Sequence, residues 1–181
     1  MWYTGFLNLK PICKKLILIR LYEKKWGVWP LTVYPAEQMP VKITVKTVIR
    51  NGQEKETYEL ITFGHYYKKM NSSFLRYDEM MEDDLVINTV VKMSSQEGSI
   101  LRNGAVKMRL PFQKNKTLTG SYESPYGVLA MKTSTTRISH KFDENVRKGE
   151  IDLLYDLRMD GSLAGTYHLT IIFEEDKHEH S

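Results

Sequence analysis

The stretch VKITVKTVIRNGQEKETYEL, residues 41–60, decides the fold class, because a turn signal joins two alternating segments within it. Residues 41–50 alternate apolar and polar side chains, the pattern of a β-strand that buries one face. The Asn51-Gly52 dipeptide that follows is typical of a two-residue hairpin turn, whose central positions both need positive φ. Such a turn places the apolar side chains on one face, with Val45 opposite Tyr58 and Ile43 opposite Leu60.

A second hairpin is predicted near the C-terminal end, where EIDLLYDLRM (150–159) and LAGTYHLTIIFEE (163–175) flank Asp160-Gly161-Ser162. A two-residue loop would set Leu153 against His168, which mixes apolar and polar side chains. A three-residue loop pairs like with like, namely Tyr155 with Tyr167, Leu153 with Leu169 and Ile151 with Ile171. We therefore predict the three-residue loop.

Further strand-like runs lie between these hairpins, near residues 58–70, 73–80, 85–94, 100–112, 117–123 and 127–142. Turn-forming residues mark breaks at Asn71-Ser72, Glu82-Asp83-Asp84, Asn103-Gly104 and Lys148-Gly149. The apolar residues of the last run change parity, which predicts a β-bulge near Thr135. We find no helical period between residues 41 and 175.

The pattern predicts an all-β domain, a single up-and-down antiparallel barrel of roughly 8–10 strands. A sandwich would also hold this many strands. Consecutive hairpins without long crossovers favour the barrel, which removes exposed strand edges. We place the barrel at residues 40–176 and a polar tail at residues 177–181.

Residues 1–39 differ from the rest in composition, since they hold all three tryptophans and Cys13, the single cysteine. We predict that they form an extension outside the barrel, added by an early start codon, with Met39 as the true start. Two alternatives stay open: an ordered extension, and a basic amphipathic helix over residues 9–26 that lies on a membrane surface. The apolar run LILI (16–19) is short and bounded by charges, so we expect no transmembrane segment.

The formal net charge of +4 lies in this extension, which holds six basic and two acidic side chains. The remaining residues have 20 basic and 20 acidic side chains, without the basic excess that binding to phosphates needs. We therefore expect no nucleic-acid partner. A single cysteine cannot form an internal disulfide, so nothing points to an oxidising compartment and we predict a cytoplasmic location.

Three segments carry a resemblance to a known family: FLRYDEM (74–80), SYESPYGVLAM (121–131) and GEIDLLYDLRMDG (149–161). Together they resemble the YwiB-like family of small bacterial proteins, over roughly residues 40–175. The resemblance implies a calycin-type barrel, related in shape to lipocalins and fatty-acid-binding proteins. The family has no assigned function, so it implies no catalytic residue. Residues 1–39 have no counterpart in it, which supports Met39 as the start.

The chain offers no recognisable catalytic or metal-binding set, and we predict no cofactor and no metal. Of the five histidines, only His178 and His180 have a ligand-like spacing, and a solvated terminus explains them better. The acidic run 77–84 lacks the spaced ligands and glycine of a calcium loop. His140 shares parity with Ile138 and Phe142, so it would face inward, where it could ligate haem or, more commonly, contact a hydroxyl.

Three functions are compatible with such a barrel. The first is non-catalytic binding of an apolar or amphipathic small molecule in the interior. The second is a filled barrel that contacts a protein partner, and the third, an enzyme, is the weakest. A cavity of about 300 Å³ or more would favour binding, and a solid core would favour interaction. The candidate ligand-binding residues are Tyr58, Tyr122, Tyr126, Tyr155 and His140, and the sequence predicts no oligomeric state.

The segment Ser124-Pro125-Tyr126-Gly127 has the residue profile of a type I turn and separates two strands. It therefore belongs at one end of the barrel. Proline and glycine alone could make this corner while both tyrosines cover the edge of the core. The alternative is a rim, in which case Tyr122 or Tyr126 lies at the barrel mouth with its ring partly exposed.

Overall fold

The computed structural model describes residues 38–81, 84–124 and 127–177. The helix considered over residues 9–26, the candidate Tyr126 and the pair His178 and His180 lie outside these residues. The predictions that concern them stay predictions, as does the choice of Met39 as the start.

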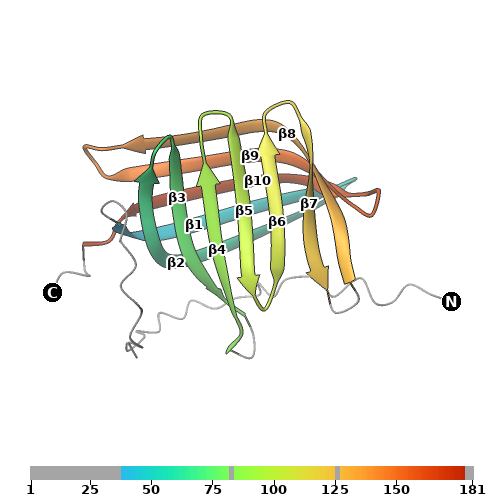
Figure 1. Cartoon of the computed structure of the whole chain (residues 1–181), viewed down its shortest axis with the longest axis horizontal. Helices are drawn as coiled ribbons and strands as arrows, with labels where there is room; N and C mark the ends of the chain where they lie inside the picture. Colours follow the sequence, from blue (N-terminus) through green and yellow to red (C-terminus); the bar gives the residue numbers. More distant parts are fainter. Residues whose placement is uncertain (1–37, 82–83, 125–126, 178–181) are drawn as a thin grey trace.

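Ten antiparallel strands form a closed barrel in which each strand pairs with its neighbours in sequence and β1 pairs with β10 (Figure 1). The predicted up-and-down barrel is confirmed, at the upper end of the expected number of strands. The strands are β1 (Met39–Asn51), β2 (Glu54–Lys69), β3 (Ser72–Met80), β4 (Val86–Met93), β5 (Glu97–Gly104), β6 (Lys107–Gln113), β7 (Thr117–Ser124), β8 (Gly127–Asp143), β9 (Lys148–Met159) and β10 (Ser162–Glu175).

The barrel is flattened into two layers that cross each other. The long strands β8, β9, β10, β1 and β2 form one layer, and the shorter strands β3–β7 run across it (Figure 1). Alternating side chains of both layers point into the space between them and are shielded from water, which explains the period of two in the sequence.

The β1–β2 hairpin is present, but its predicted register was wrong by two residues. Asn51 pairs with Glu54, so the loop is Gly52-Gln53, and Val45 lies opposite Leu60. Gly52 has a φ of +60°, whereas neither Asn51 nor Gln53 has a positive φ. A single positive φ at the first loop position is the pattern of a type II′ turn, which needs glycine only there. Because the shift is even, every side chain keeps its predicted face.

The β9–β10 hairpin confirms the predicted register but not the predicted loop. Tyr155 lies opposite Tyr167, as expected. The turn itself contains two residues, Asp160 and Gly161, and both have positive φ. A bulge between Leu163 and Gly165 then shifts the register by one. The residue that brings the apolar pairs into alignment is therefore the bulge residue in β10 and not a third loop residue. The Asp-Gly dipeptide favours the two-residue loop.

Two other local predictions had different outcomes. The bulge expected near Thr135 is present, since the β8–β9 register shifts between Thr135 and Arg137. The break expected at Lys148-Gly149 is wrong, because both residues lie in β9. Gly149 is there because the ring of Phe173 packs over it: an added Cβ would lie 2.1 Å from that ring. Close approach of a side chain, and not a turn, explains this glycine.

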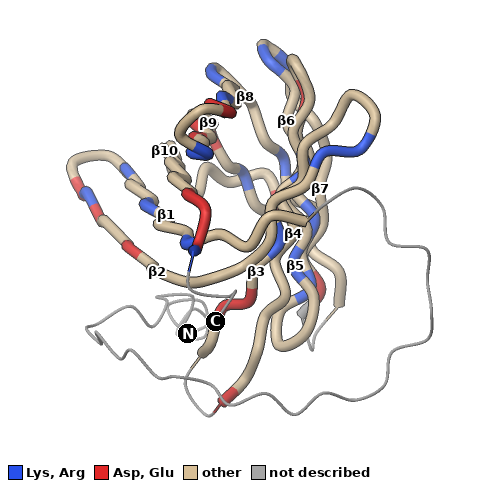
Figure 2. Tube along the Cα trace, turned by 90° about the vertical axis from the view of Figure 1, so that its left-hand side faces the viewer, with Lys and Arg blue, Asp and Glu red and all other residues tan. Residues whose placement is uncertain are grey.

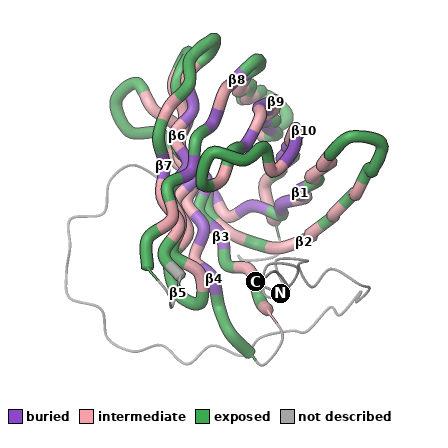
Figure 3. Tube along the Cα trace, turned by 90° about the vertical axis from the view of Figure 1, so that its right-hand side faces the viewer, coloured by how far each residue is buried: buried purple, intermediate pink, exposed green. Residues whose placement is uncertain are grey.

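Buried residues lie on strands of both layers (Figure 3), and they form one hydrophobic core cluster. The bulkiest of the fully buried ones are Phe112, Phe173, Ile43, Leu75 and Met93. Met93, Leu153 and Tyr155 are buried in this core, whereas Tyr58 and Met108 are half-buried. The centre of the barrel is therefore a packed core, and partly exposed inward-facing residues lie toward its two ends.

Candidate functional site

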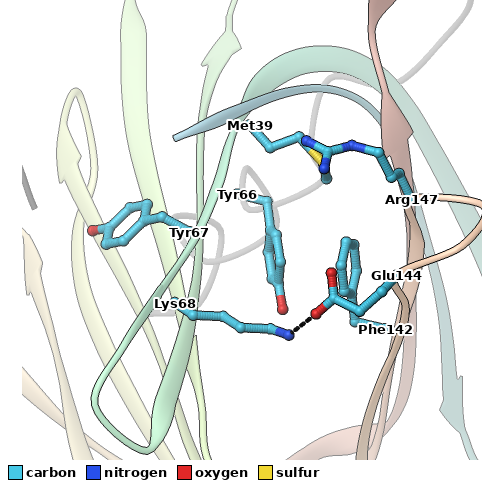
Figure 4. A pocket seen from close by; sticks show the side chains of 7 residues that line it. All are labelled: Met39, Tyr66, Tyr67, Lys68, Phe142, Glu144 and Arg147. Atoms are coloured by element: carbon cyan, nitrogen blue, oxygen red, sulfur yellow. Dashed lines mark hydrogen bonds and ion pairs between the residues drawn. The ribbon is translucent and has the colours of Figure 1, made fainter. Parts of the chain in front are cut away.

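The Tyr66 mouth is the end of the barrel where β1 begins and β10 ends. It holds a cavity of about 170 Å³ (Figure 4). The cavity is lined by Met39, Tyr66, Tyr67, Lys68, Phe142, Glu144 and Arg147. These residues come from β1, from β2, and from β8 with the turn after it. Antiparallel pairing of Met39 with Tyr66 brings the first two strands together at this end.

Stacked aromatic rings form the apolar wall of this cavity. The ring centroid of Tyr66 lies 4.7 Å from that of Phe142 and 4.7 Å from that of Phe173. The Tyr66 hydroxyl donates a hydrogen bond to Ser73 Oγ at 3.1 Å. Burial raises the pKa of Tyr66, so its phenol stays protonated near neutral pH. Rings with one polar atom at their edge can hold a flat ligand and orient it.

Charged side chains form the rim. Lys68 Nζ donates to Glu144 Oε1 and lies 4.9 Å from the ring centroid of Phe142, a cation–π contact (Figure 4). The hydrogen bond with Glu144 raises the pKa of Lys68. Arg147 Nε lies 2.7 Å from Glu175 Oε1. The Lys68–Glu144 pair is half-exposed, and an exposed ion pair contributes little to stability. Either residue can therefore bind an incoming charged group in place of its present partner at little cost in free energy.

His140 faces inward, as its parity predicted, and lies next to this mouth. Its Nε2 is 3.5 Å from the Tyr66 hydroxyl, and its ring stacks on Phe173 with centroids 6.4 Å apart. Burial, and to a smaller extent the charge of Lys68, lower its pKa, so the neutral imidazole is favoured. A hydroxyl partner is the commoner alternative to a haem ligand. His140 therefore supports the ring of Tyr66 from behind the cavity.

The three other described candidates lie at the opposite end, which we call the Arg102 mouth. Tyr77, Thr89, Arg102, Met108 and Tyr122 are successive cross-strand partners from β3 to β7. Tyr122 is half-buried at the edge of the core, so its ring is partly exposed.

The facing layer brings the remaining tyrosines to the Arg102 mouth. Tyr155 stacks on Tyr167 with ring centroids 5.4 Å apart, and the Tyr58 hydroxyl donates to Glu56. Burial raises the pKa of Tyr155, and the nearby hydroxyl of Tyr167 adds to the effect. This phenol therefore stays protonated near neutral pH.

Charged groups at the Arg102 mouth are bound to one another. Arg102 Nη2 lies 3.0 Å from Glu79 Oε1, and Thr89 Oγ1 donates to the same carboxylate at 2.6 Å. Because both partners of Glu79 come from neighbouring strands, this network holds β3, β4 and β5 together. We interpret it as a structural element of the wall.

An Asp–His–Arg cluster lies on the outer surface of the barrel. His168 Nε2 is 2.7 Å from Asp152 Oδ2 and 3.0 Å from Arg137 Nη2. Burial opposes ionisation of Asp152, but hydrogen bonds from His168 and Arg137 lower its pKa overall. The cluster joins β8, β9 and β10 across one face of the sheet, which is its evident role.

Sequence reasoning missed most of the Tyr66 mouth. Tyr66, Lys68 and Phe142 were assigned to strands, yet nothing in their own segments shows that these strands meet. Two features of the sequence could have indicated the site. Phe142 has the same parity as His140, so both face inward, and the β1–β2 hairpin places Tyr66 beside the start of β1. Glu144 lies in a turn, where pattern predicts exposure and not a partner.

Comparison with known proteins agrees with this architecture. The family described as a domain of unknown function (DUF1934) matches residues 43–171. The uncharacterized β-barrel protein YwiB of Bacillus subtilis (strain 168) is 35% identical over 143 residues, which are 78% of this chain and 98% of that protein. The chain belongs to this family. The family resemblance predicted from the sequence is thereby confirmed.

A solved member of the DUF1934 family has the same fold. The crystal structure of the YwiB protein from Bacillus subtilis aligns with a TM-score of 0.67 and 33% identity, over 77% of this chain and 93% of that one. In the part of this chain that the structure describes, no helix has the length and apolar character to cross a bilayer.

Proposed function

We propose that the barrel binds a small aromatic molecule with a polar head group at the Tyr66 mouth, and that it does so without catalysis. The observation that carries the proposal is a cavity with an aromatic wall and a charged rim. Its volume of about 170 Å³ is below the value of about 300 Å³ that would favour a ligand in the interior, so the guest proposed here is smaller and binds at the mouth. One ring, or the end of a longer molecule, is therefore the expected guest.

The interior is a poorer location for a ligand than the mouth. Leu153 and Ile171 are fully buried in the core, and a guest there would have to displace them. Each displaced side chain would lose about 1.5–3 kcal/mol of burial. At the mouth, Phe142 is half-buried, so a ring can contact its exposed part without displacing a core side chain, while its head group reaches Lys68 or Glu144.

Ligand-observed NMR on the full chain tests the proposal, with benzoate and benzylamine as probes of opposite charge. We expect saturation transfer to both rings, and Lys68→Gln should weaken the signal of benzoate more than that of benzylamine. Lys107→Gln is the matched control, because Lys107 forms an exposed pair with Glu123 at a distant site. Native mass spectrometry of freshly purified protein should show a bound small molecule.

Two results would overturn the proposal. The first is the absence of both saturation transfer and any co-purified molecule. The second is an equal loss of benzoate binding in the Lys68→Gln and Lys107→Gln variants, since a site at the Tyr66 mouth requires the two lysines to differ.

Contact with a protein partner is a second candidate function, and the packed core is the observation that favours it. A filled interior leaves the outer surface as the larger area for recognition. There, Ile61, Phe63 and Ile172 are exposed to 63%, 60% and 39%. Apolar side chains that gather on the surface of a small protein often mark an interface. For either function we place the protein in the cytoplasm.

A further inference from the structure

One strand of the barrel has an open edge. β2 pairs with β1 along the whole hairpin, from Glu54 to Tyr66, whereas its ladder with β3 runs only from Gly64 to Lys69. Among the described residues, the part of β2 that precedes Gly64 therefore has a strand partner on one side. The β1–β2 hairpin projects beyond the rest of the wall at this place (Figure 3). A long strand edge of this kind can pair with another strand.

The turn determines which backbone groups face this edge. In a two-residue hairpin the closing pair, here Asn51 with Glu54, is hydrogen-bonded, and such pairs alternate along the ladder. The amide and carbonyl groups of Lys55, Thr57 and Ile61 therefore point away from β1, toward the edge. Their side chains lie on the outer face of the barrel and are exposed.

The charges along this edge are self-complementary. In the hairpin, β1 carries basic residues and β2 carries both acidic and basic ones (Figure 2). In an antiparallel pair of two β2 strands centred on Thr57, Lys55 lies opposite Glu59 of the second copy, and the two-fold axis repeats this contact. A centre at Glu59 would instead place two glutamates opposite each other, which is unfavourable. The charges of the edge therefore favour the register centred on Thr57 over the one centred on Glu59.

We infer that a second copy of this chain adds its β2 to this edge, which gives a two-fold symmetric dimer with a sheet continuous across both barrels. Glu59 also binds Lys46 of its own chain, with Nζ and Oε1 2.8 Å apart. Its side chain is 60% exposed, so its carboxylate can accept a second ammonium group. Ile61 then lies opposite Gln53 of the second copy, which covers part of its exposed side chain. The inference is independent of ligand binding at the Tyr66 mouth.

A charge-swap experiment tests the inference on the full chain. Sedimentation equilibrium should show the mass rising from 21.2 kDa toward twice this value as the concentration increases. Lys55→Glu and Glu59→Lys each create two like-charge contacts and should raise the dissociation constant about tenfold or more. The double variant restores opposite charges in both contacts and should recover the dimer. Thr57→Pro removes the central amide donor and should weaken association further.

Lys107→Glu serves as the matched control, since it reverses a charge in the distant Lys107–Glu123 pair and should leave the dissociation constant unchanged. Circular dichroism confirms that each variant is folded. The inference is overturned by a chain that stays monomeric at about 300 μM, a concentration at which specific pairing of this size should show. It is also overturned if Lys55→Glu and Lys107→Glu have equal effects, or if the double variant fails to recover.

Discussion

His140 is a titratable side chain held between aromatic rings, and the free energy of unfolding should report its protonation. Lys68 and Tyr66 are the groups that face it, and burial lowers its pKa in the folded state. In the unfolded chain the pKa returns to about 6.5, so the unfolded state binds the proton more readily. As the pH falls through this value, the folded state is therefore destabilised relative to the unfolded state.

We predict that the free energy of unfolding rises with pH between the lowered pKa and about 6.5, and that His140 adds no slope above it. His140→Phe keeps an aromatic ring against Phe173 but removes the proton site, so the slope should become smaller. Urea unfolding of both proteins at several pH values below neutrality gives the comparison. The same slope in both would show that His140 is not the group responsible.

The β1–β2 hairpin shows how an element can differ from its pattern without changing the fold. Its turn requires a positive φ at Gly52 alone. We predict that Gly52→Ala costs about 1–2 kcal/mol in the free energy of unfolding, because alanine is strained at positive φ. Asn51→Ala should cost much less. Chemical denaturation of the two variants measures both changes. Similar losses in the free energy of unfolding would instead indicate an Asn-Gly turn with two positive φ values.

The strands, their order and two of their irregularities could be predicted because alternation and turn residues are local signals. The bulge near Thr135 and the alignment of Tyr155 with Tyr167 followed from parity alone. The loop lengths could not be fixed in this way, because an extra residue has the same effect on register in a turn as in a bulge. Gly149 was mistaken for a turn, since the ring of Phe173 that requires it lies on another strand.

The candidate site was predicted less well than the fold. Of the tyrosines chosen for their place on strands, Tyr58, Tyr122 and Tyr155 lie toward the Arg102 mouth, whereas the cavity lined by Tyr66 lies at the other end. Which end of a barrel remains hollow depends on how large side chains from several strands fit together. Alternation shows that Tyr66 and Phe142 face inward but not that their rings stack.

At the scale of the whole molecule, the described strands close the barrel among themselves. Met39 begins β1, is 5% exposed and lies opposite Tyr66. We predict that a chain starting at Met39 keeps the circular dichroism spectrum and the urea midpoint of the full chain. A chain starting at Thr44 lacks the buried Val41 and Ile43 and should not fold cooperatively. Loss of cooperative unfolding in the Met39 chain would contradict the prediction.

The pairing of β1 with β10 also sets the order of events during synthesis. Among the described strands, β1 is synthesised first and β10 last. β1 cannot complete its pairing until β10 has been made, since Val41 pairs with Glu175. Until then β1 exposes one edge, and contacts this distant in sequence form slowly. A transcript truncated within β10 would leave β1 and β9 each without one of its two neighbours. Such nascent chains are expected to depend on chaperones and to aggregate when these are scarce.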